Sequence, residues 1–256
     1  MKSSIKSVFI WMAVTLLIVS WVPLLGLFRL FDRDPALYRT GLMFRTLGKW
    51  ITKVNPEWSI HISGNQDIDD RRPYIIVSNH LSNADIPVIS NLRIEMKWIA
   101  KKELFDVPVS GWMMKMAGDI PIDRRDPRSQ ISTLKKAVFY LRNRCSVMFF
   151  PEGTRSRSGK LGRFTNGAFH LAIREGVPVL PLVVDGTQDC LPKNSWKFGS
   201  APEIRLKVLE PISVDEFSPN EVDRLTLTVR DQILNQLAEW RRTDPDAVDG
   251  AAPNKE

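Results

Sequence analysis

The amino-acid sequence predicts an α/β fold in which a central mixed sheet is flanked by helices, with an N-terminal membrane-associated helical segment. From residue 58 onward, short apolar runs of strand length alternate with longer runs of helical periodicity, which is typical of an α/β sheet. Ahead of that region, residues 8–28 include no charged residue. The 256 residues suffice for one large domain with extensions. We expect the helical segment at 1–56, the domain at 57–242 and a disordered tail at 243–256.

The uncharged stretch at residues 8–28 has the length that a membrane requires. As a helix it would extend about 31 Å, close to the thickness of a bilayer core. Pro23 and Gly26 interrupt it, and the part before Pro23 would reach only about 22 Å. A kinked span and a helix that enters the bilayer and turns back both remain open. A cleaved signal peptide is the third interpretation, although no small-x-small cleavage site ends the run.

Positive charge is concentrated on the C-terminal side of this stretch. Only Lys2 and Lys6 precede it, whereas the residues that follow include Arg29, Arg33, Arg39, Arg45, Lys49 and Lys53. Because basic residues favour the inner side of a membrane, we expect an inner-membrane protein whose domain faces the cytoplasm. Residues 36–53 are predicted as an amphipathic helix with a basic face. That face suits an anionic lipid surface, or it is a solvated face of a helix packed on the domain.

The strands expected in the domain are short apolar runs between polar or turn-forming residues. The first, at 59–62, is expected at a sheet edge, and further strands are expected at 74–77, 97–100, 147–150, 177–184 and 204–208. Pro178 and Pro181 place the strand at 177–184 at a sheet edge or a distortion, since proline cannot donate a ladder hydrogen bond.

Helices are predicted between these strands from their start and stop residues. Pro87 is compatible with the first turn of a helix at 85–92. Apolar residues recur at helical spacing across 129–142, and Gly176 closes a helix at 166–174. Residues 218–221 form a capping box that opens a helix ending near Trp240.

The formal net charge of +7 and the pI of about 9.5 favour a polyanionic partner: nucleic acid, an anionic membrane or a phosphorylated substrate. The basic residues are not interleaved with aromatic residues that could stack on bases, so we expect no nucleic-acid partner. Residues 153–160 also depart from a nucleotide-binding phosphate loop in glycine spacing. Cys145 and Cys190 form no CxxC pair and no cluster with a histidine, so we expect reduced thiols and no metal site.

His80 is the candidate general base. It follows the expected strand at 74–77, and Asp85 lies five positions later in what is predicted to be a loop. A carboxylate there can reach the imidazole Nδ1–H, fix the tautomer and leave the other nitrogen free to accept a proton. His170 and Glu175 have the same spacing, but on a helix five residues turn the side chains about 140° apart. We therefore expect His170 to be a packed helix residue.

Two arginines are candidates for binding a phosphate. Arg155 follows Gly153 in a turn after the buried strand at 147–150, and Arg124 ends a short strand-like run. Glycine allows a tight turn whose N–H can approach an anion, and a guanidinium group matches the geometry of phosphate. For either arginine taken alone, the sequence favours a solvated surface turn over a phosphate site.

These segments together resemble the glycerolipid acyltransferase family, whose best-known members are the lysophosphatidate acyltransferases. The family carries four ordered blocks, which correspond here to Asn79-His80-x4-Asp85, Gly118-x3-Ile122-Asp123-Arg124, Phe150 to Ser156 and Val177-Pro178-x2-Pro181. The third block, Phe-Pro-Glu-Gly-Thr-Arg-Ser, matches without change.

The resemblance implies transfer of a fatty acyl group from acyl-CoA or acyl-ACP to the sn-2 hydroxyl of 1-acylglycerol 3-phosphate, which forms phosphatidic acid. The partners would be the lysolipid acceptor, the acyl thioester donor and the membrane surface. Acyl carrier protein is one of the carriers of the donor that the resemblance implies. No resident cofactor or metal is implied. The alternatives are another acceptor (a lysophospholipid, glycerol 3-phosphate or a lyso-aminolipid) and a thioester hydrolase.

The resemblance also implies roles for individual residues. His80 would remove the proton of the attacking hydroxyl, and Asp85 would orient His80. Substrate binding would fall to Arg124, Glu152, Gly153, Thr154 and Arg155, with the two arginines holding the phosphate.

Overall fold

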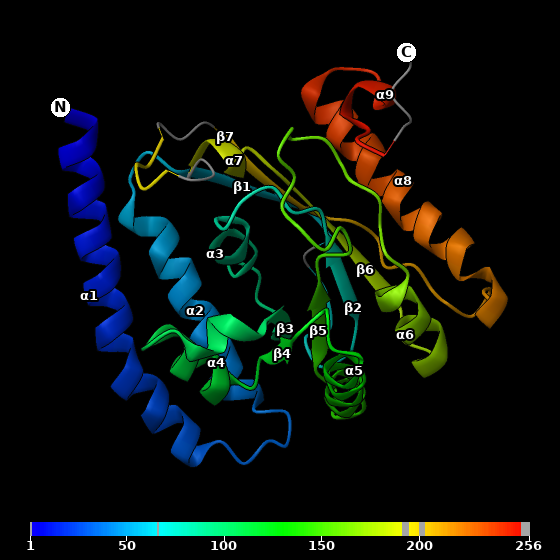
Figure 1. Ribbon diagram of the computed structural model, residues 1–256, viewed down its shortest axis with the longest axis horizontal. Helices are drawn as coiled ribbons and strands as arrows, with labels where there is room; N and C mark the ends of the chain where they lie inside the picture. Colours follow the sequence, from blue (N-terminus) through cyan, green and yellow to red (C-terminus); the bar gives the residue numbers. More distant parts are fainter. Residues whose placement is uncertain (1, 66, 191–194, 200–202, 252–256) are drawn as a thin grey trace. The chain divides into compact units, whose positions relative to one another are not determined.

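The computed structural model describes residues 2–65, 67–190, 195–199 and 203–251. The seven strands in these residues follow the order β1-β7-β6-β2-β5-β3-β4 in one sheet (Figure 1). They are β1 (Ser59–Gly64), β2 (Ile75–Ser78), β3 (Met96–Lys101), β4 (Ile120–Ile122), β5 (Ser146–Phe149), β6 (Val179–Asp185) and β7 (Glu203–Val208). β6 and β7 are antiparallel, whereas β1 with β7, β2 with β6, and β3 with β4 and β5 are parallel. The predicted fold class, an α/β fold with a mixed sheet and flanking helices, is confirmed.

The helices alternate with these strands along the chain. The α-helices are α1 (Lys2–Phe31), α2 (Tyr38–Val54), α3 (Asp85–Ile89), α4 (Ser110–Ala117), α5 (Pro127–Arg142), α6 (Gly167–Glu175), α7 (Thr187–Cys190), α8 (Val222–Arg241) and α9 (Pro245–Val248). Two 3-10 helices are η1 (Lys102–Asp106) and η2 (Pro219–Glu221). The capping box expected at Ser218 and Glu221 is present and opens η2, which leads into α8.

β6 shows how a strand with prolines fits inside a sheet. It lies between β7 and β2, so the sheet-edge placement expected from Pro178 and Pro181 is wrong. The pairing of β6 with β7 begins only at Leu182, opposite Val208. Pro181 precedes that pairing, and on the side toward β7 its carbonyl accepts a hydrogen bond from the Leu209 N–H at 3.0 Å. The N–H that proline lacks is therefore not needed on this side.

The chain forms two compact units. The first comprises Met1–Pro56, Asp67–Tyr74 and Ile86–Met148, and the second comprises Glu57–Gln66, Ile75–Asp85 and Phe149–Glu256. In the first unit, α1, α2 and α4 pack around Leu25, Leu47 and Met113, each at most 2% exposed. The Trp21 indole N–H on α1 donates to the Met43 carbonyl on α2 at 3.1 Å, which fixes the two helices together.

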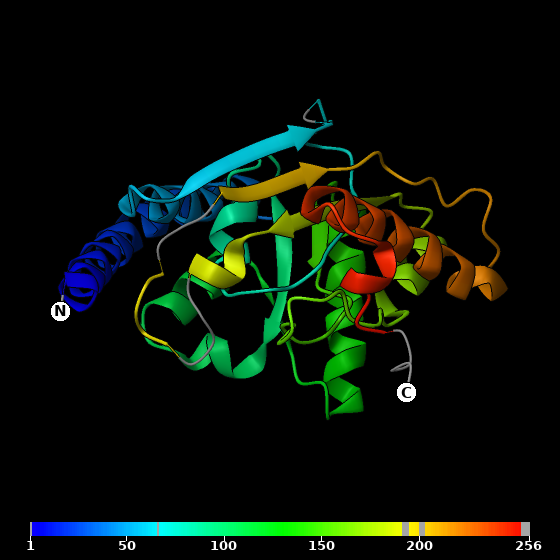
Figure 2. The same cartoon turned by 90° about the horizontal axis from the view of Figure 1, so that it is seen from above.

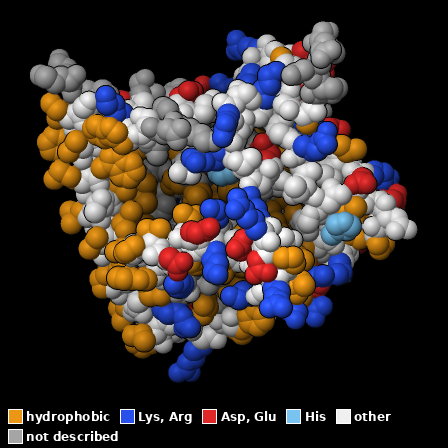
Figure 3. Space-filling model, viewed as in Figure 1, with side chains coloured by type: hydrophobic (Ala, Val, Ile, Leu, Met, Phe, Trp, Pro, Cys, Tyr) orange, Lys and Arg blue, Asp and Glu red, His pale blue; other side chains and the backbone are white. Residues whose placement is uncertain are grey.

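The opposite side of α1 is apolar and exposed. α1 continues through Pro23, and its residues 4–31 are long and apolar enough, by length and composition, to cross a membrane. The exposed large apolar side chains along it are Ile5, Val8, Phe9, Trp11, Met12, Leu16, Val19, Leu24, Leu27, Phe28, Leu30 and Phe31 (Figure 3). In water such a continuous apolar surface is unfavourable, so α1 indicates membrane association.

α2 departs from the expected amphipathic pattern at one position. Arg45 was expected on a basic face with Lys49 and Lys53, but its side chain is only 4% exposed. It faces Glu95 and Asp119, which are far away in the sequence. A solvated basic face is therefore wrong for Arg45, because a helical period reveals which residues share a face but not which distant carboxylates they meet.

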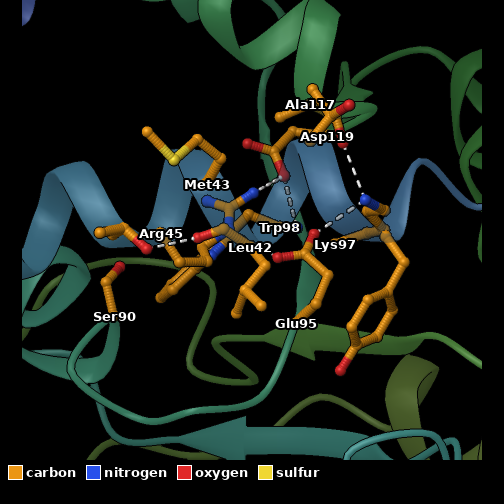
Figure 4. A network of polar contacts seen from close by, with 12 residues as sticks. Leu42, Met43, Arg45, Ser90, Glu95, Lys97, Trp98, Ala117 and Asp119 are labelled. Atoms are coloured by element: carbon orange, nitrogen blue, oxygen red, sulfur yellow. Dashed lines mark hydrogen bonds and ion pairs between the residues drawn. The ribbon is translucent and has the colours of Figure 1, made fainter. Parts of the chain in front are cut away.

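Arg45 belongs to a buried charge cluster of two cations and two anions: Arg45, Glu95, Lys97 and Asp119 (Figure 4). Lys97 Nζ lies 2.8 Å from Glu95 Oε1, and Arg45 Nε lies 3.5 Å from Glu95 Oε2. The Arg45 guanidinium also donates to Asp119. None of the four residues is more than 6% exposed, so each charge depends on an opposite charge for the stabilisation that water would otherwise supply.

Backbone groups complete this cluster. Lys97 Nζ donates to the carbonyls of Ala117 at 2.8 Å and Leu37 at 3.2 Å, and Asp119 accepts the Trp98 N–H at 3.0 Å. Gly41 allows α2 to approach, because a Cβ there would lie 1.8 Å from Glu95 Oε1. The cluster thus joins α2, β3 and the turn before β4 within the first unit.

In the second unit, β1 and β7 lie side by side, α6 packs on β2, and α8 packs on β6 (Figure 2). α9 lies beside α8. The composition of the tail predicts disorder from residue 243, whereas residues 243–251 contain α9 and a bridge between Asp249 and Leu161. Composition alone cannot reveal a partner so distant along the chain. Residues 252–256 lie outside the described part.

Candidate active site

The loop that follows β2 carries the candidate base. Asn79 is the first residue after the strand, and its side chain is 1% exposed. The Asn79 amide donates to the Val184 carbonyl at 2.7 Å, and its oxygen accepts the Val184 N–H at 2.9 Å. These two hydrogen bonds attach the loop to β6. The backbone that leads into His80 is therefore held in place.

His80 and Asp85 meet as the sequence predicts. His80 Nδ1 lies 2.7 Å from Asp85 Oδ2. The Asp85 side chain is fully buried, whereas that of His80 is 15% exposed. Because a carboxylate accepts, the Nδ1 atom carries the shared proton, and Nε2 is the nitrogen that can take up another.

Asp85 is held by further donors. Oδ2 accepts the N–H groups of Leu81 at 2.8 Å and Ser82 at 2.9 Å, and Oδ1 accepts the hydroxyl of Thr187. A buried carboxylate needs this number of donors, and together they fix the direction in which it faces His80. Thr187 is a site residue that the sequence analysis missed. It follows β6, the neighbour of β2 in the sheet, and in parallel strands the two carboxyl ends lie at one edge.

Phe150 covers one face of the His80 imidazole. The two rings are stacked with centroids 3.9 Å apart and an angle of 15° between their planes. The contact restricts rotation of the imidazole about its bond to the chain. Phe150 begins the block from Phe150 to Ser156 that carries the family resemblance, but its contact with the histidine could not be inferred from the spacing.

Glu152 binds the same loop through the backbone. Its Oε1 accepts the His80 N–H at 2.7 Å, and its Oε2 accepts the Gly162 N–H at 2.8 Å. Burial raises the pKa of the Glu152 carboxyl, against the effect of these two hydrogen bonds, which lower it. In return, the Ser156 N–H donates to the His80 carbonyl at 2.8 Å. Residues 150–165, here called the Glu152 loop, therefore bind His80 through both of its backbone groups.

Gly153, Thr154 and Arg155 form the turn of the Glu152 loop. Gly153 has a φ of 73°, which favours glycine, and its N–H donates to the Phe150 carbonyl at 2.9 Å. Thr154 is exposed and Arg155 half-buried. Among the described residues, none forms a hydrogen bond or an ion pair with the Arg155 guanidinium, so this group is available to an anion.

Arg124 belongs to the first unit, whereas His80, Asp85 and the predicted residues of the Glu152 loop belong to the second. It is exposed and follows β4. The Gln130 side chain donates to its carbonyl at 2.8 Å, which braces the turn. That Arg124 shares a phosphate with Arg155 stays a prediction.

No group of three or more histidine, cysteine, aspartate or glutamate side chains in the described part of the chain is arranged to hold a metal ion. Cys145 and Cys190 are both buried and free. Burial raises the pKa of each thiol to about 12. The described site thus provides an imidazole oriented by a carboxylate, and the Glu152 loop carries the Arg155 guanidinium.

Comparisons with known proteins identify a family and several similar proteins. The sequence model of a family described as Acyltransferase matches residues 59–185. A chloroplast 1-acyl-sn-glycerol-3-phosphate acyltransferase from Brassica napus is 37% identical over 72% of this chain and 53% of its own length. The counterpart from Arabidopsis thaliana is 39% identical over 62% of this chain and 45% of its own length. The chain thus spans about half the length of these two relatives.

Two further proteins are matched over more of their length. The 1-acyl-sn-glycerol-3-phosphate acyltransferase of Saccharomyces cerevisiae is 31% identical over 75% of this chain and 67% of its own. The crystal structure of the 1-acyl-sn-glycerophosphate acyltransferase PlsC from Thermotoga maritima is similar with a TM-score of 0.80 and 27% identity. The structural match covers 94% of this chain and 96% of the PlsC chain.

Proposed function

Because the chain belongs to the acyltransferase family, we propose that it transfers a fatty acyl group from acyl-CoA or acyl-ACP to the sn-2 hydroxyl of 1-acylglycerol 3-phosphate. The product is phosphatidic acid. The relatives are named for this reaction, and this chain carries a histidine oriented for it. The single observation that supports the chemistry best is the 2.7 Å contact of His80 Nδ1 with the buried Asp85 carboxylate.

In the proposed reaction, His80 Nε2 takes the proton of the acceptor hydroxyl as that oxygen attacks the thioester carbonyl. The new C–O bond forms, the C–S bond breaks, and the proton passes from the imidazole to the departing thiolate. Base catalysis of this kind contributes roughly 10²–10⁴-fold. Asp85 stabilises the imidazolium that exists between the two proton transfers.

We propose that the acceptor phosphate binds at the Glu152 loop; a contribution of Arg124, which belongs to the first unit, stays a prediction from the sequence. The Arg155 guanidinium supplies a planar pair of donors, and Gly153, whose own N–H is bonded to the Phe150 carbonyl, allows the tight turn that leads to it. Thr154, exposed beside them, offers a hydroxyl. Glu152 contributes by holding the loop, since both of its carboxylate oxygens accept backbone N–H groups.

We propose that the protein lies at the inner membrane with its domain in the cytoplasm, where the thioester donors are. The exposed apolar side of α1 supports membrane association, because it would reach lipid acceptors in the bilayer. Replacing Leu16, 71% exposed on α1, by lysine should reduce flotation of the protein with lipid vesicles. Leu227→Lys, a change at an exposed leucine on α8, serves as the control and should float as the wild type does.

An acyl-transfer assay with the full-length protein in mixed micelles tests the function. Palmitoyl-CoA and palmitoyl-ACP are each offered with 1-acylglycerol 3-phosphate, glycerol 3-phosphate, a lysophospholipid and a lyso-aminolipid. We expect the fastest product to be phosphatidic acid. Faster acylation of another acceptor would reassign the substrate. Free fatty acid released equally fast with and without acceptor would indicate a thioester hydrolase.

A further inference from the structure

Arg230 of α8 reaches the Glu152 loop from the C-terminal part of the chain. The residue is 6% exposed. Its Nε donates to the Gly162 carbonyl at 3.0 Å, and its Nη2 donates to the Leu161 carbonyl at 3.1 Å. The same guanidinium forms an ion pair with Asp249, which follows α9. One buried side chain thus connects the loop, α8 and the C-terminal segment.

The C-terminal segment also holds one of these two loop residues, Leu161, through its backbone. The Leu161 N–H donates to the Val248 carbonyl at 2.8 Å, and the Gly250 N–H donates to the Leu161 carbonyl at 2.9 Å. Leu161 is 1% exposed. Because backbone and side-chain bonds converge here, the loop cannot move at this point unless α9 or Arg230 moves with it.

Gly162 passes this constraint on to the candidate base. Its N–H donates to Glu152 Oε2 at 2.8 Å, and Glu152 Oε1 accepts the His80 N–H at 2.7 Å. A Cβ at position 162 would lie 2.7 Å from Glu152 Oε2, so glycine permits the close approach. A continuous series of contacts therefore runs from Arg230 through Gly162 and Glu152 to the backbone of His80.

We propose that Arg230 is a positioning residue, which acts through Gly162 and Glu152 to hold His80 where it can take the acceptor proton. The proposal rests on the function proposed above. Arg230 lies away from the reacting atoms in this series and is satisfied by protein partners, so a direct contact with substrate is not required of it. Displacing a reacting group by about 1 Å can lower a rate by roughly 10²-fold, so its loss should appear mainly in kcat.

Arg241 provides a matched control on the same helix. Its guanidinium binds Asp185 and donates to the Gly159 carbonyl at 2.8 Å, also in the Glu152 loop. Gly159 is not bonded to Glu152, whereas Gly162 is. If only the series through Gly162 matters, Arg230 and Arg241 should differ in their effect on turnover.

The test measures acyl transfer by Arg230→Met, Arg230→Lys and Arg241→Met. We expect Arg230→Met to lower kcat about 10- to 100-fold, with the KM for the acceptor changed less than kcat. Arg230→Lys should recover part of the loss, because lysine keeps the charge opposite Asp249 but loses the paired donors. Arg241→Met should stay close to the wild type. An equal loss in Arg241→Met, or a loss confined to KM, would overturn the proposal.

A double-mutant cycle with Glu152→Gln separates positioning from general loosening. If Arg230 acts through Glu152, the effects of the two changes on kcat should be strongly non-additive. Additive effects would contradict the series of contacts.

Hydrogen exchange gives a result that does not depend on activity. The amides of His80 and Gly162 should exchange faster in Arg230→Met and unchanged in Arg241→Met; unchanged exchange in both would contradict the inference. If instead the wild type fails to acylate every acceptor while exchange changes as expected, the proposed function fails and the structural role of Arg230 stands.

Discussion

The two units of the protein each bury a cluster of charged or polar side chains, but the two clusters differ in charge balance and in exposure. In the buried charge cluster of the first unit, two cations face two anions, and no member is more than 6% exposed. Around His80 in the second unit, the carboxylate is equally buried, but the imidazole remains 15% exposed. The first cluster is balanced in charge and shielded from water, whereas the second keeps a partly exposed basic nitrogen.

The carboxylates of the two clusters illustrate the same contrast. Burial raises the pKa of Glu95, and the neighbouring Lys97 and Arg45 counteract this. Asp85 is stabilised by neutral donors, the N–H groups of Leu81 and Ser82 and the hydroxyl of Thr187. Because no fixed cation neutralises Asp85 in these contacts, its charge remains available to stabilise an imidazolium at His80.

The largest effect is expected from Asp85→Asn. An asparagine amide can donate to Nδ1, which would favour the wrong tautomer and remove the charge that stabilises the imidazolium. We expect kcat to fall by roughly 10³–10⁴-fold, with the thermal unfolding temperature changed little by comparison. Steady-state kinetics and thermal unfolding in the same detergent check this. A variant with near-normal turnover would remove Asp85 from the mechanism.

The next effect concerns the buried charge cluster. Arg45→Met removes the cation that faces Asp119 and Glu95 Oε2. The free energy of unfolding should therefore fall by about 3–5 kcal/mol. Lys53→Met, at an exposed position on the same helix, should change it by less than about 0.5 kcal/mol. Thermal and denaturant unfolding measure both. If the two variants were equally stable, the cluster would not stabilise the first unit.

Arg155→Ala tests the anion-binding part of the candidate active site. Losing a charge-assisted hydrogen bond costs about 1.5–3 kcal/mol, so kcat/KM for phosphate-bearing acceptors should fall roughly 10- to 150-fold. Monoacylglycerol, which lacks the phosphate, should be affected much less. Arg157→Ala, exposed in the same loop, is the control. An equal loss with both acceptors would contradict a phosphate contact.

The smallest effect is expected in the alkylation of the two cysteines, one near each cluster. Burial raises the pKa of Cys145 to about 12; the nearby Glu95 carboxylate adds to this rise, whereas Lys97 and Arg45 oppose it. The pKa of Cys190 is raised to about 12 by burial, Asp189 and Asp85. A raised pKa leaves little thiolate near neutral pH, so iodoacetamide should modify neither cysteine in the native protein.

The Arg45→Met variant sharpens this measurement. Peptide mass spectrometry should then show faster alkylation of Cys145 and unchanged alkylation of Cys190. Equal acceleration at both positions would mean that the two clusters do not stabilise separate regions.

Local patterns predict those parts of the molecule whose determinants are close in sequence. His80 and Asp85 are five residues apart in one loop, and the capping box at residues 218–221 is equally local, so both were predictable. Arg45 pairs with Asp119 across 74 residues and Arg230 bonds to Leu161 across 69 residues, and no periodicity encodes these contacts. Thr187 is 102 residues from Asp85, and the two residues meet only because β2 and β6 are neighbours in the sheet.

Turnover of His80→Ala, measured beside His170→Ala, tests most directly whether the imidazole held by Asp85 is the base. His170 lies on α6 as expected but is exposed rather than packed, so the same substitution there controls for the loss of an imidazole. With both proteins folded, we predict that His80→Ala loses acyl transfer to 1-acylglycerol 3-phosphate and that His170→Ala retains it. Near-normal transfer by His80→Ala would contradict the mechanism.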